Sequence, residues 1–271
     1  MKAKKVLIIV LTVLVFLSCS VLGISSVYRV DVVFVSADTI SQEAETERLE
    51  LQERLNTAYH KASSLFADEE EVKTALADFP YFRFVAFEKD YPNRLVVRVV
   101  EDMEVYAAVC DETAGTYYIL NADGMILGVR EGYVNRSDET GQSNNILLSG
   151  VEITGERGEM ATGGEDFNGL LAFCKKADEL LDGIRRNIVS VTYLQRANVE
   201  ATATLKLTTA EGVNIYVHEP AVAPESKAVE AMQTYLGLAD GERTHGMIAV
   251  AGTAESVTAV YSPNDIFAEE N

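Results

Sequence analysis

The sequence is short of the residues that build disulfide scaffolds. It has three cysteines and three histidines among 271 residues, and no tryptophan. Three cysteines exclude a disulfide scaffold, because such folds need a much higher density of cysteine to replace a missing core. Stability must therefore come from packing. With 48% apolar residues, the chain can bury the core of one or two modest domains.

Basic residues are also scarce. The chain has 23 Lys and Arg against 42 Asp and Glu, which gives a net charge of −19. A surface of that sign repels the phosphate backbone, so nucleic acid is excluded as a partner. The apolar content is at the same time too high for a disordered acidic chain. The composition indicates a folded, acidic protein.

Motifs for catalysis and for metal or phosphate binding are missing as well. His60, His218 and His245 stand alone, with no second His, Cys or carboxylate at ligand spacing. The glycine-rich stretch 155–164 lacks the Gly-Lys-Ser/Thr sequence that cradles a phosphate. We therefore predict no catalytic residues, no metal and no cofactor, and favour a protein that works by binding other proteins.

Two of the cysteines lie within predicted strands and helices. Cys110 ends a predicted strand, and Cys174 lies on the apolar side of a predicted helix. A bridge between them and a pair of buried free thiols both fit an exported domain, and the thiols are favoured because such a Cys behaves as a small hydrophobe. Neither has a basic neighbour placed to lower its thiol pKa, so we predict no nucleophile.

The longest apolar run lies near the amino terminus. Residues 6–24 contain no charge, and at 1.5 Å per residue they would cover about 30 Å of hydrocarbon. We therefore predict a membrane-spanning helix over residues 6–26. Its anchor positions include Val6, Leu11, Phe16 and Ile24.

The charges around this run predict its orientation. Lys2, Lys4 and Lys5 precede it, so residues 1–5 would form a cytoplasmic tail and the bulk of the chain would be extracytoplasmic. This describes a single-pass type II protein that spans the cell membrane. A cleaved signal peptide and a lipoprotein acylated at Cys19 are the alternatives, although the run is longer than a signal-peptide core.

The residues that follow predict a small α+β domain over 27–101. Residues 27–35 are rich in β-branched types and predict a strand. Apolar residues recur three and four apart over 44–63, and an acidic turn opens a second helical run at 68–79. Two more strands flank a proline turn. The order strand, helix, helix, strand, strand lets both helices cover one face of a three-stranded sheet.

A larger β-rich domain of mixed α/β type is predicted over 102–262, followed by a tail over 263–271. Apolar periodicity predicts helices at 166–181 and 227–238, and the polar residues 131–145 predict an exposed loop. Strands are predicted near 103–109, 116–120, 125–127, 187–195, 199–208, 213–218, 246–251 and 255–261.

Several of these segments together carry a resemblance. A helix ends at Pro80, a strand follows, and the proline turn at Pro92 leads into a strand of alternating β-branched residues that closes with Glu101. Residues 117–124 (Tyr-Tyr-Ile-Leu-Asn-Ala-Asp-Gly) then give an aromatic strand and an Asp-Gly hairpin. In these features and in the order of its parts, the chain resembles the FtsQ/DivIB family of bacterial cell-division proteins.

The chain departs from the family pattern at three places. Ser36-Ala37-Asp38 stands where the family has Gly-Asn, and Glu101-Asp102-Met103 replaces Glu-Arg-Pro. Ala249-Val250-Ala251 stands near the last strands where Asp-Leu-Arg is common. The resemblance therefore lies in the order of the elements and not in these three motifs.

The resemblance implies a fold and a function. Residues 27–101 would be a POTRA domain, and the protein would be a non-enzymatic scaffold of the division machinery, the divisome. Its partners would be FtsL and FtsB/DivIC-type bitopic proteins, bound outside the membrane at the septum. A membrane- or lipid-anchored binding module unrelated to division is the alternative, and an exported enzyme without a known motif is another.

The last predicted strand supplies a candidate binding site. No strand follows residues 255–261 in the sequence, so at a sheet edge this strand could accept a strand of another chain through backbone hydrogen bonds. Val257, Ala259 and Tyr261 would lie on one face of it. An edge blunted by its own polar residues and tail is the alternative.

Overall fold

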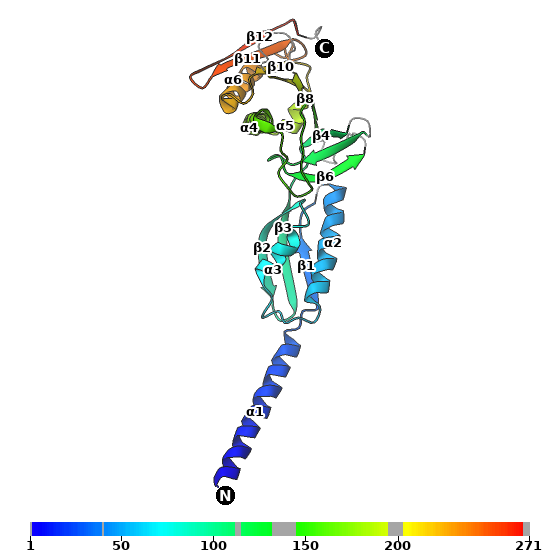
Figure 1. The fold of residues 1–271 in the computed structure, drawn as a ribbon, viewed down its shortest axis with the longest axis vertical. Coiled ribbons are helices and arrows are strands. Elements are labelled where there is room, and N and C mark those ends of the chain that lie inside the picture. Colours follow the sequence, from blue (N-terminus) through cyan, green and yellow to red (C-terminus); the bar gives the residue numbers. More distant parts are fainter. Residues whose placement is uncertain (1, 40, 112–114, 132–144, 195–202, 268–271) are drawn as a thin grey trace. The chain divides into compact units, whose positions relative to one another are not determined.

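The computed structural model describes residues 2–39, 41–111, 115–131, 145–194 and 203–267, and their side chains except those of 2–9, 22, 24–26 and 111. The chain divides into two compact units, Met1–Asp102 and Met103–Asn271. Both α-helices and β-strands build it, and the larger unit contains a nine-stranded sheet (Figure 1). The α+β class expected from the sequence is therefore present.

The membrane-spanning helix predicted over residues 6–26 is wrong. The segment does form a helix, α1 (Lys2–Val27). Within the part of the chain that the structure describes, however, no helix is long and apolar enough to cross a membrane. Of the predicted anchor positions, Leu11 and Phe16 are exposed, and the side chains of Val6 and Ile24 lie outside the described residues.

The described part of α1 contains one weakly polar segment. Ser18, Cys19 and Ser20 stand together there and lower the apolar character of the helix at that point.

The rest of the first unit has the expected strand, helix, helix, strand, strand order. It consists of β1 (Val32–Ser36), α2 (Gln42–Tyr59), α3 (Glu69–Leu76), β2 (Phe82–Asp90) and β3 (Arg94–Glu101). The sheet order is β1-β3-β2, with β1 parallel and β2 antiparallel to the central β3. Helices α2 and α3 connect β1 to β2 in the sequence, and these two strands lie at the two edges of the sheet.

Capping and apolar stripes explain the two helices. The side chain of Ser41 accepts a hydrogen bond from the backbone N–H of Ala44 at the start of α2, and Asp68 accepts one from Glu70 at the start of α3. The apolar stripes of both helices are buried. Val33 and Val35 of β1 are also buried, whereas Val32 and Phe34 are exposed, so helices cover one face of the sheet.

The second unit is built on a mixed sheet with the order β12-β11-β10-β9-β8-β7-β4-β5-β6. Helices α4 (Gly164–Leu181) and α6 (Pro224–Gly237) pack on each other and bury the main core with the sheet, and α5 is short (Ile184–Asn187). The strands are β4 (Tyr106–Asp111), β5 (Thr116–Leu120), β6 (Ile126–Glu131), β7 (Ile146–Ser149), β8 (Ile188–Leu194), β9 (Thr204–Thr209), β10 (Asn214–His218), β11 (Met247–Thr253) and β12 (Ser256–Ser262).

One strand of this sheet was not expected. β7 has only four residues and lies between β4 and β8, parallel to both. Ile146 and Leu148 are buried. The predicted loop at 131–145 ends directly before it. Residues 132–144 lie outside the described part of the chain, as do residues 195–202, which include the end of the predicted strand 187–195 and the start of the predicted strand 199–208.

The cysteines form no disulfide among the described residues, and the three thiols are free. Cys174 is buried, as expected, and burial raises the pKa of its thiol to about 12. Cys110 is exposed, which corrects the expectation of a second buried thiol. The strand end at which it lies faces solvent rather than the core.

The start of the carboxyl-terminal tail is anchored. Asp265 accepts hydrogen bonds from the side-chain amide of Asn214 at 2.7 Å and from the hydroxyl of Tyr216 at 3.1 Å, both on β10. The ring of Phe267 meets that of Tyr216 edge-on, with centroids 5.0 Å apart. We call these contacts of Asp265 and Phe267 the tail latch. Residues 268–271 lie outside the described part.

Candidate functional site

Strand β12 forms one end of the nine-stranded sheet, as Figure 1 shows at the top of the view. It pairs antiparallel with β11 along its whole length, from Thr253–Ser256 at the turn to Met247–Ser262. No described strand pairs with its other side. The predicted strand at 255–261 is therefore an edge strand.

The turn determines which backbone groups of β12 face outward. Only Ala254 and Glu255 separate the two strands, so Thr253 and Ser256 form the hydrogen-bonded pair that closes the turn. Hydrogen-bonded and non-bonded pairs alternate along an antiparallel ladder. Counting from the turn, the N–H and C=O groups of Val257, Ala259 and Tyr261 point away from β11, toward the open edge.

The side chains of these three residues point elsewhere. Val257, Ala259 and Tyr261 pack against the main core, on the side covered by α6. The hydroxyl of Tyr261 donates to the backbone oxygens of Glu242 at 3.1 Å and His245 at 3.3 Å. Burial raises the pKa of this hydroxyl, and the Glu242 carboxylate raises it further. The side chains thus hold β12 against the core, and the backbone N–H and C=O groups remain available to a partner strand.

The composition of β12 does not oppose pairing. Its seven residues, Ser-Val-Thr-Ala-Val-Tyr-Ser, include no charge and no proline, and its register with β11 has no irregularity. Protected edges usually carry lysine, proline or a bulge. On the face opposite α6, Val260 is 63% exposed, so an apolar side chain lies beside the edge.

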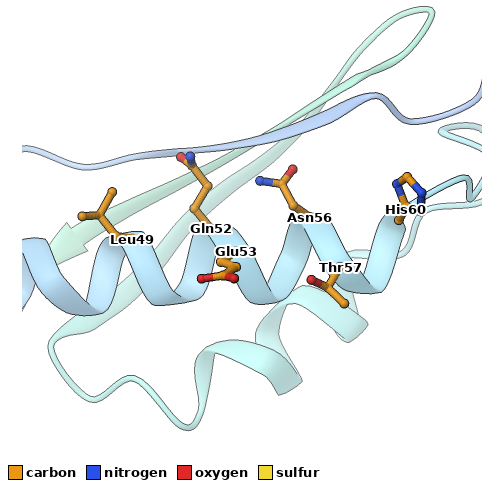
Figure 2. Close-up of a pocket in the computed structure, with 6 residues that line it drawn as sticks. All are labelled: Leu49, Gln52, Glu53, Asn56, Thr57 and His60. Carbon is orange, nitrogen blue, oxygen red and sulfur yellow. The ribbon is translucent and has the colours of Figure 1, made fainter.

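The edge at β1 is closed by side chains of α2. The side-chain oxygen of Asn56 accepts a hydrogen bond from the backbone N–H of Val33 at 2.7 Å, and that of Gln52 accepts one from Val35 at 3.3 Å. Arg48 donates to the backbone oxygen of Val35. Figure 2 shows Gln52 and Asn56 pointing from α2 toward the neighbouring strand. These amides occupy the positions that a partner strand would need.

A surface pocket of about 480 Å³ lies along the same helix. Leu49, Gln52, Glu53, Asn56, Thr57 and His60 line it (Figure 2). Glu53 and His60 are seven residues apart, which places them about 10 Å apart along the helix axis, too far for a carboxylate–imidazole hydrogen bond. We therefore interpret the pocket as the groove beside the side-chain amides of Gln52 and Asn56, which we call the capping amides, and not as a catalytic site.

The two remaining edges are also protected. Strand β2 has an irregularity between Phe84 and Ala86 and carries four charged residues, which discourage pairing. At β6, the backbone of Ile126 exchanges hydrogen bonds of 2.8 Å with the 158–159 segment, and the guanidinium of Arg157 donates to the oxygen of Leu127. Of the four sheet edges in the described residues, β12 is the one without such protection.

The sequence predicted the strand at 255–261 but left its position at a sheet edge open, and it missed the protection of the other edges. The sequence does contain a signal for the protection of β1. Arg48, Gln52 and Asn56 are spaced four residues apart and form a polar stripe beside the buried stripe of α2. No such signal marks β6, whose cover comes from a loop some thirty residues away along the chain.

Neither a metal site nor a similarity to known proteins assigns a function to the chain. The described residues contain no group of three or more His, Cys, Asp or Glu residues that could hold a metal ion. No model of a known protein family matches the chain, and no curated protein matches it.

Proposed function

We propose that this protein is a non-enzymatic scaffold that binds other proteins by adding one of their strands to β12. The observation that carries the proposal is the open edge of β12, with three outward-facing residues, no charge, no proline and no irregularity. Strand addition of this kind is an established mode of peptide recognition.

The backbone alone gives limited affinity. Three outward-facing residues offer three donors and three acceptors, and each net hydrogen bond contributes about 0.5–1.5 kcal/mol. Association itself costs about 4–15 kcal/mol in lost translational and rotational freedom. A partner must therefore also contact side chains beside the edge, and Val260 supplies an exposed apolar contact there.

We further propose that the setting is bacterial cell division, at the septum, with FtsL and FtsB/DivIC-type proteins as partners. This part rests on the resemblance of residues 64–124 to the FtsQ/DivIB family and on the position of the edge at the last strand, near which the family's partner surface also lies. The β-α-α-β-β order of the first unit is compatible with a POTRA domain.

Co-purification with a co-expressed FtsL–DivIC pair tests the strand addition. Ala259→Pro removes an N–H that points to the edge while leaving the bonds to β11 in place, so we expect recovery of the pair to fall at least tenfold, the effect of about 1.4 kcal/mol. Deletion of Glu255–Asn271 should abolish recovery. Val129→Thr makes the same kind of change at an exposed position of β6, away from the β12 edge, and serves as the control. Unchanged recovery with folded Ala259→Pro would contradict strand addition.

A fluorescent fusion separates the division setting from the binding mode. We expect it to concentrate at midcell in dividing cells. An even distribution, together with partner binding that still depends on Ala259, would contradict the division assignment and leave a binding module of another system.

A further inference from the structure

One end of the first unit presents aromatic and basic side chains to solvent. We call it the aromatic tip and define it by the residues Tyr28, Arg29, Lys61, Leu65, Phe66, Lys89 and Tyr91. Hydrogen bonds join its segments. The backbone N–H of Ser64 donates to the oxygen of Tyr28 at 2.7 Å, its hydroxyl donates to the oxygen of Pro92 at 2.6 Å, and Lys89 donates to the oxygen of Leu65.

Phe66 protrudes from this tip. It is 86% exposed, the highest value among the exposed large hydrophobic residues of the described chain. Its neighbours Ser64 and Ala67 are buried, and its own N–H donates to the oxygen of Ser63. The loop is thus held on both sides of Phe66, and the aromatic ring faces water in a fixed segment.

Two tyrosines accompany Phe66. The rings of Tyr28 and Tyr91 meet edge-on with centroids 5.7 Å apart, and Tyr91 is 53% exposed. Tyrosine combines an apolar ring with a polar hydroxyl and is enriched where hydrocarbon meets lipid headgroups. Phenylalanine and leucine are the residues that insert below the headgroups.

The charge of the tip differs from that of the chain. Arg29, Lys61 and Lys89 lie at the tip of a protein whose net charge is −19. The acidic residues nearby are engaged within the protein. Asp31 accepts from the side chain of Asn93, and Asp90 pairs with Arg94.

One more acidic residue lies close in sequence. Asp68 follows the tip directly, and its side chain caps the first turn of α3. With Arg94 included, the basic residues Arg29, Lys61 and Lys89 outnumber the three nearby aspartates by one, and anionic lipid headgroups are the partner that this local excess of positive charge would attract.

We propose that the aromatic tip makes a shallow contact with the surface of a phospholipid bilayer that contains anionic lipid. Phe66 and Leu65 enter the boundary between headgroups and acyl chains, the two tyrosines lie at headgroup level, and the basic residues meet lipid phosphates. The contact lies in the first unit and is independent of the edge at β12.

The absence of tryptophan from the chain gives a local test. Phe66→Trp places the only indole of the full-length protein at the tip, and the 86% exposure of the site means that the change removes no packing. Val129→Trp on β6, where the native residue is 58% exposed, is the matched control. Leu65→Trp reports on the same tip if the first variant folds poorly.

The variants are mixed with vesicles of phosphatidylcholine and phosphatidylglycerol, with and without acyl-chain bromination. We expect indole emission from Phe66→Trp to move to shorter wavelength and to lose roughly half its intensity or more to bromine, because an interfacial ring lies about 5–10 Å below the headgroups. Emission from Val129→Trp should not change. An unchanged Phe66→Trp signal, or equal quenching of both variants, overturns the proposal, and equal responses to vesicles without phosphatidylglycerol overturn its electrostatic part.

Discussion

Each of the two sheets ends in a strand with one unpaired side, β1 in the first unit and β12 in the second. At β1, the amides of Gln52 and Asn56 bond the outward N–H groups of Val35 and Val33. At β12, the equivalent groups of Val257, Ala259 and Tyr261 have no strand or helix side chain placed on them among the described residues. This difference shows that side chains of a neighbouring helix can occupy the free backbone groups of an edge strand. The edge strand then needs no bulge or charge of its own.

Proline substitutions along β12 give the largest expected effect. The N–H of Thr258 bonds to β11, so Thr258→Pro should lower the free energy of unfolding by about 3 kcal/mol. The N–H of Ala259 points to the open edge, so Ala259→Pro should lower it by no more than about 1 kcal/mol. Urea denaturation followed by circular dichroism measures both. Equal destabilisation by the two prolines would show that the edge is not open.

Removing the capping amides should make β1 resemble β12. Gln52→Ala with Asn56→Ala leaves two N–H groups of β1 without their partners, which we expect to cost about 2–4 kcal/mol in unfolding free energy. The exposed edge should also promote self-association, measured by light scattering. Glu53→Ala with Thr57→Ala changes the neighbouring positions of the same helix and should do neither. A monomer as stable as this control would contradict the capping role.

A buried tyrosine in each unit makes the two units comparable at high pH. Burial, with the Glu71 carboxylate, raises the pKa of Tyr59 to about 12, and burial, with Glu211, raises that of Tyr235 to about 12. Unfolded tyrosine ionises near pH 10. Each hydroxyl therefore contributes stability that is complete below pH 10 and is lost as the pH rises toward 12.

We expect each unit to lose on the order of 2 kcal/mol of stability over this pH range. Tyr59→Phe and Tyr235→Phe should each remove one phenolate absorbance step near pH 12 and reduce the alkaline slope. A titration in which both variants ionise like the parent protein would show that these hydroxyls are solvated.

Loss of the tail latch should give the smallest effect. Asp265→Ala removes hydrogen bonds to Asn214 and Tyr216, and because the site is partly exposed we expect a loss of about 1 kcal/mol. Thermal unfolding of the full chain measures it. Asn264→Ala, at an exposed neighbour, should leave the melting temperature unchanged, and equal melting temperatures for the two variants would contradict a role for the latch.

Local patterns predicted the elements of the fold well. The four-residue spacing of Leu51, Leu55 and Tyr59 predicted a buried stripe, and all three are buried. The acidic residue Asp68 before an apolar run predicted a helix start, and it caps α3. The alternation in the last strand placed Val257, Ala259 and Tyr261 on one face, and all three pack toward the core.

Properties that depend on tertiary arrangement were not predictable in this way. Which strands become edges follows from the sheet order, and so does the role of Gln52 and Asn56. β7 escaped prediction because its four residues gain their pairing from β4 and β8, far away in the sequence. Cys110 was expected in the core because the side of a strand that faces solvent is not evident at the end of a short apolar run.

The tail latch also has a mechanical consequence for the edge. A partner strand on β12 would transmit any pull to the protein through the hydrogen bonds between β12 and β11. Asp265 adds a second connection, because it ties the segment after β12 directly to β10. Tension at the edge is thereby shared between two inner strands, and the last strand of the sheet is held more firmly than a simple hairpin would hold it.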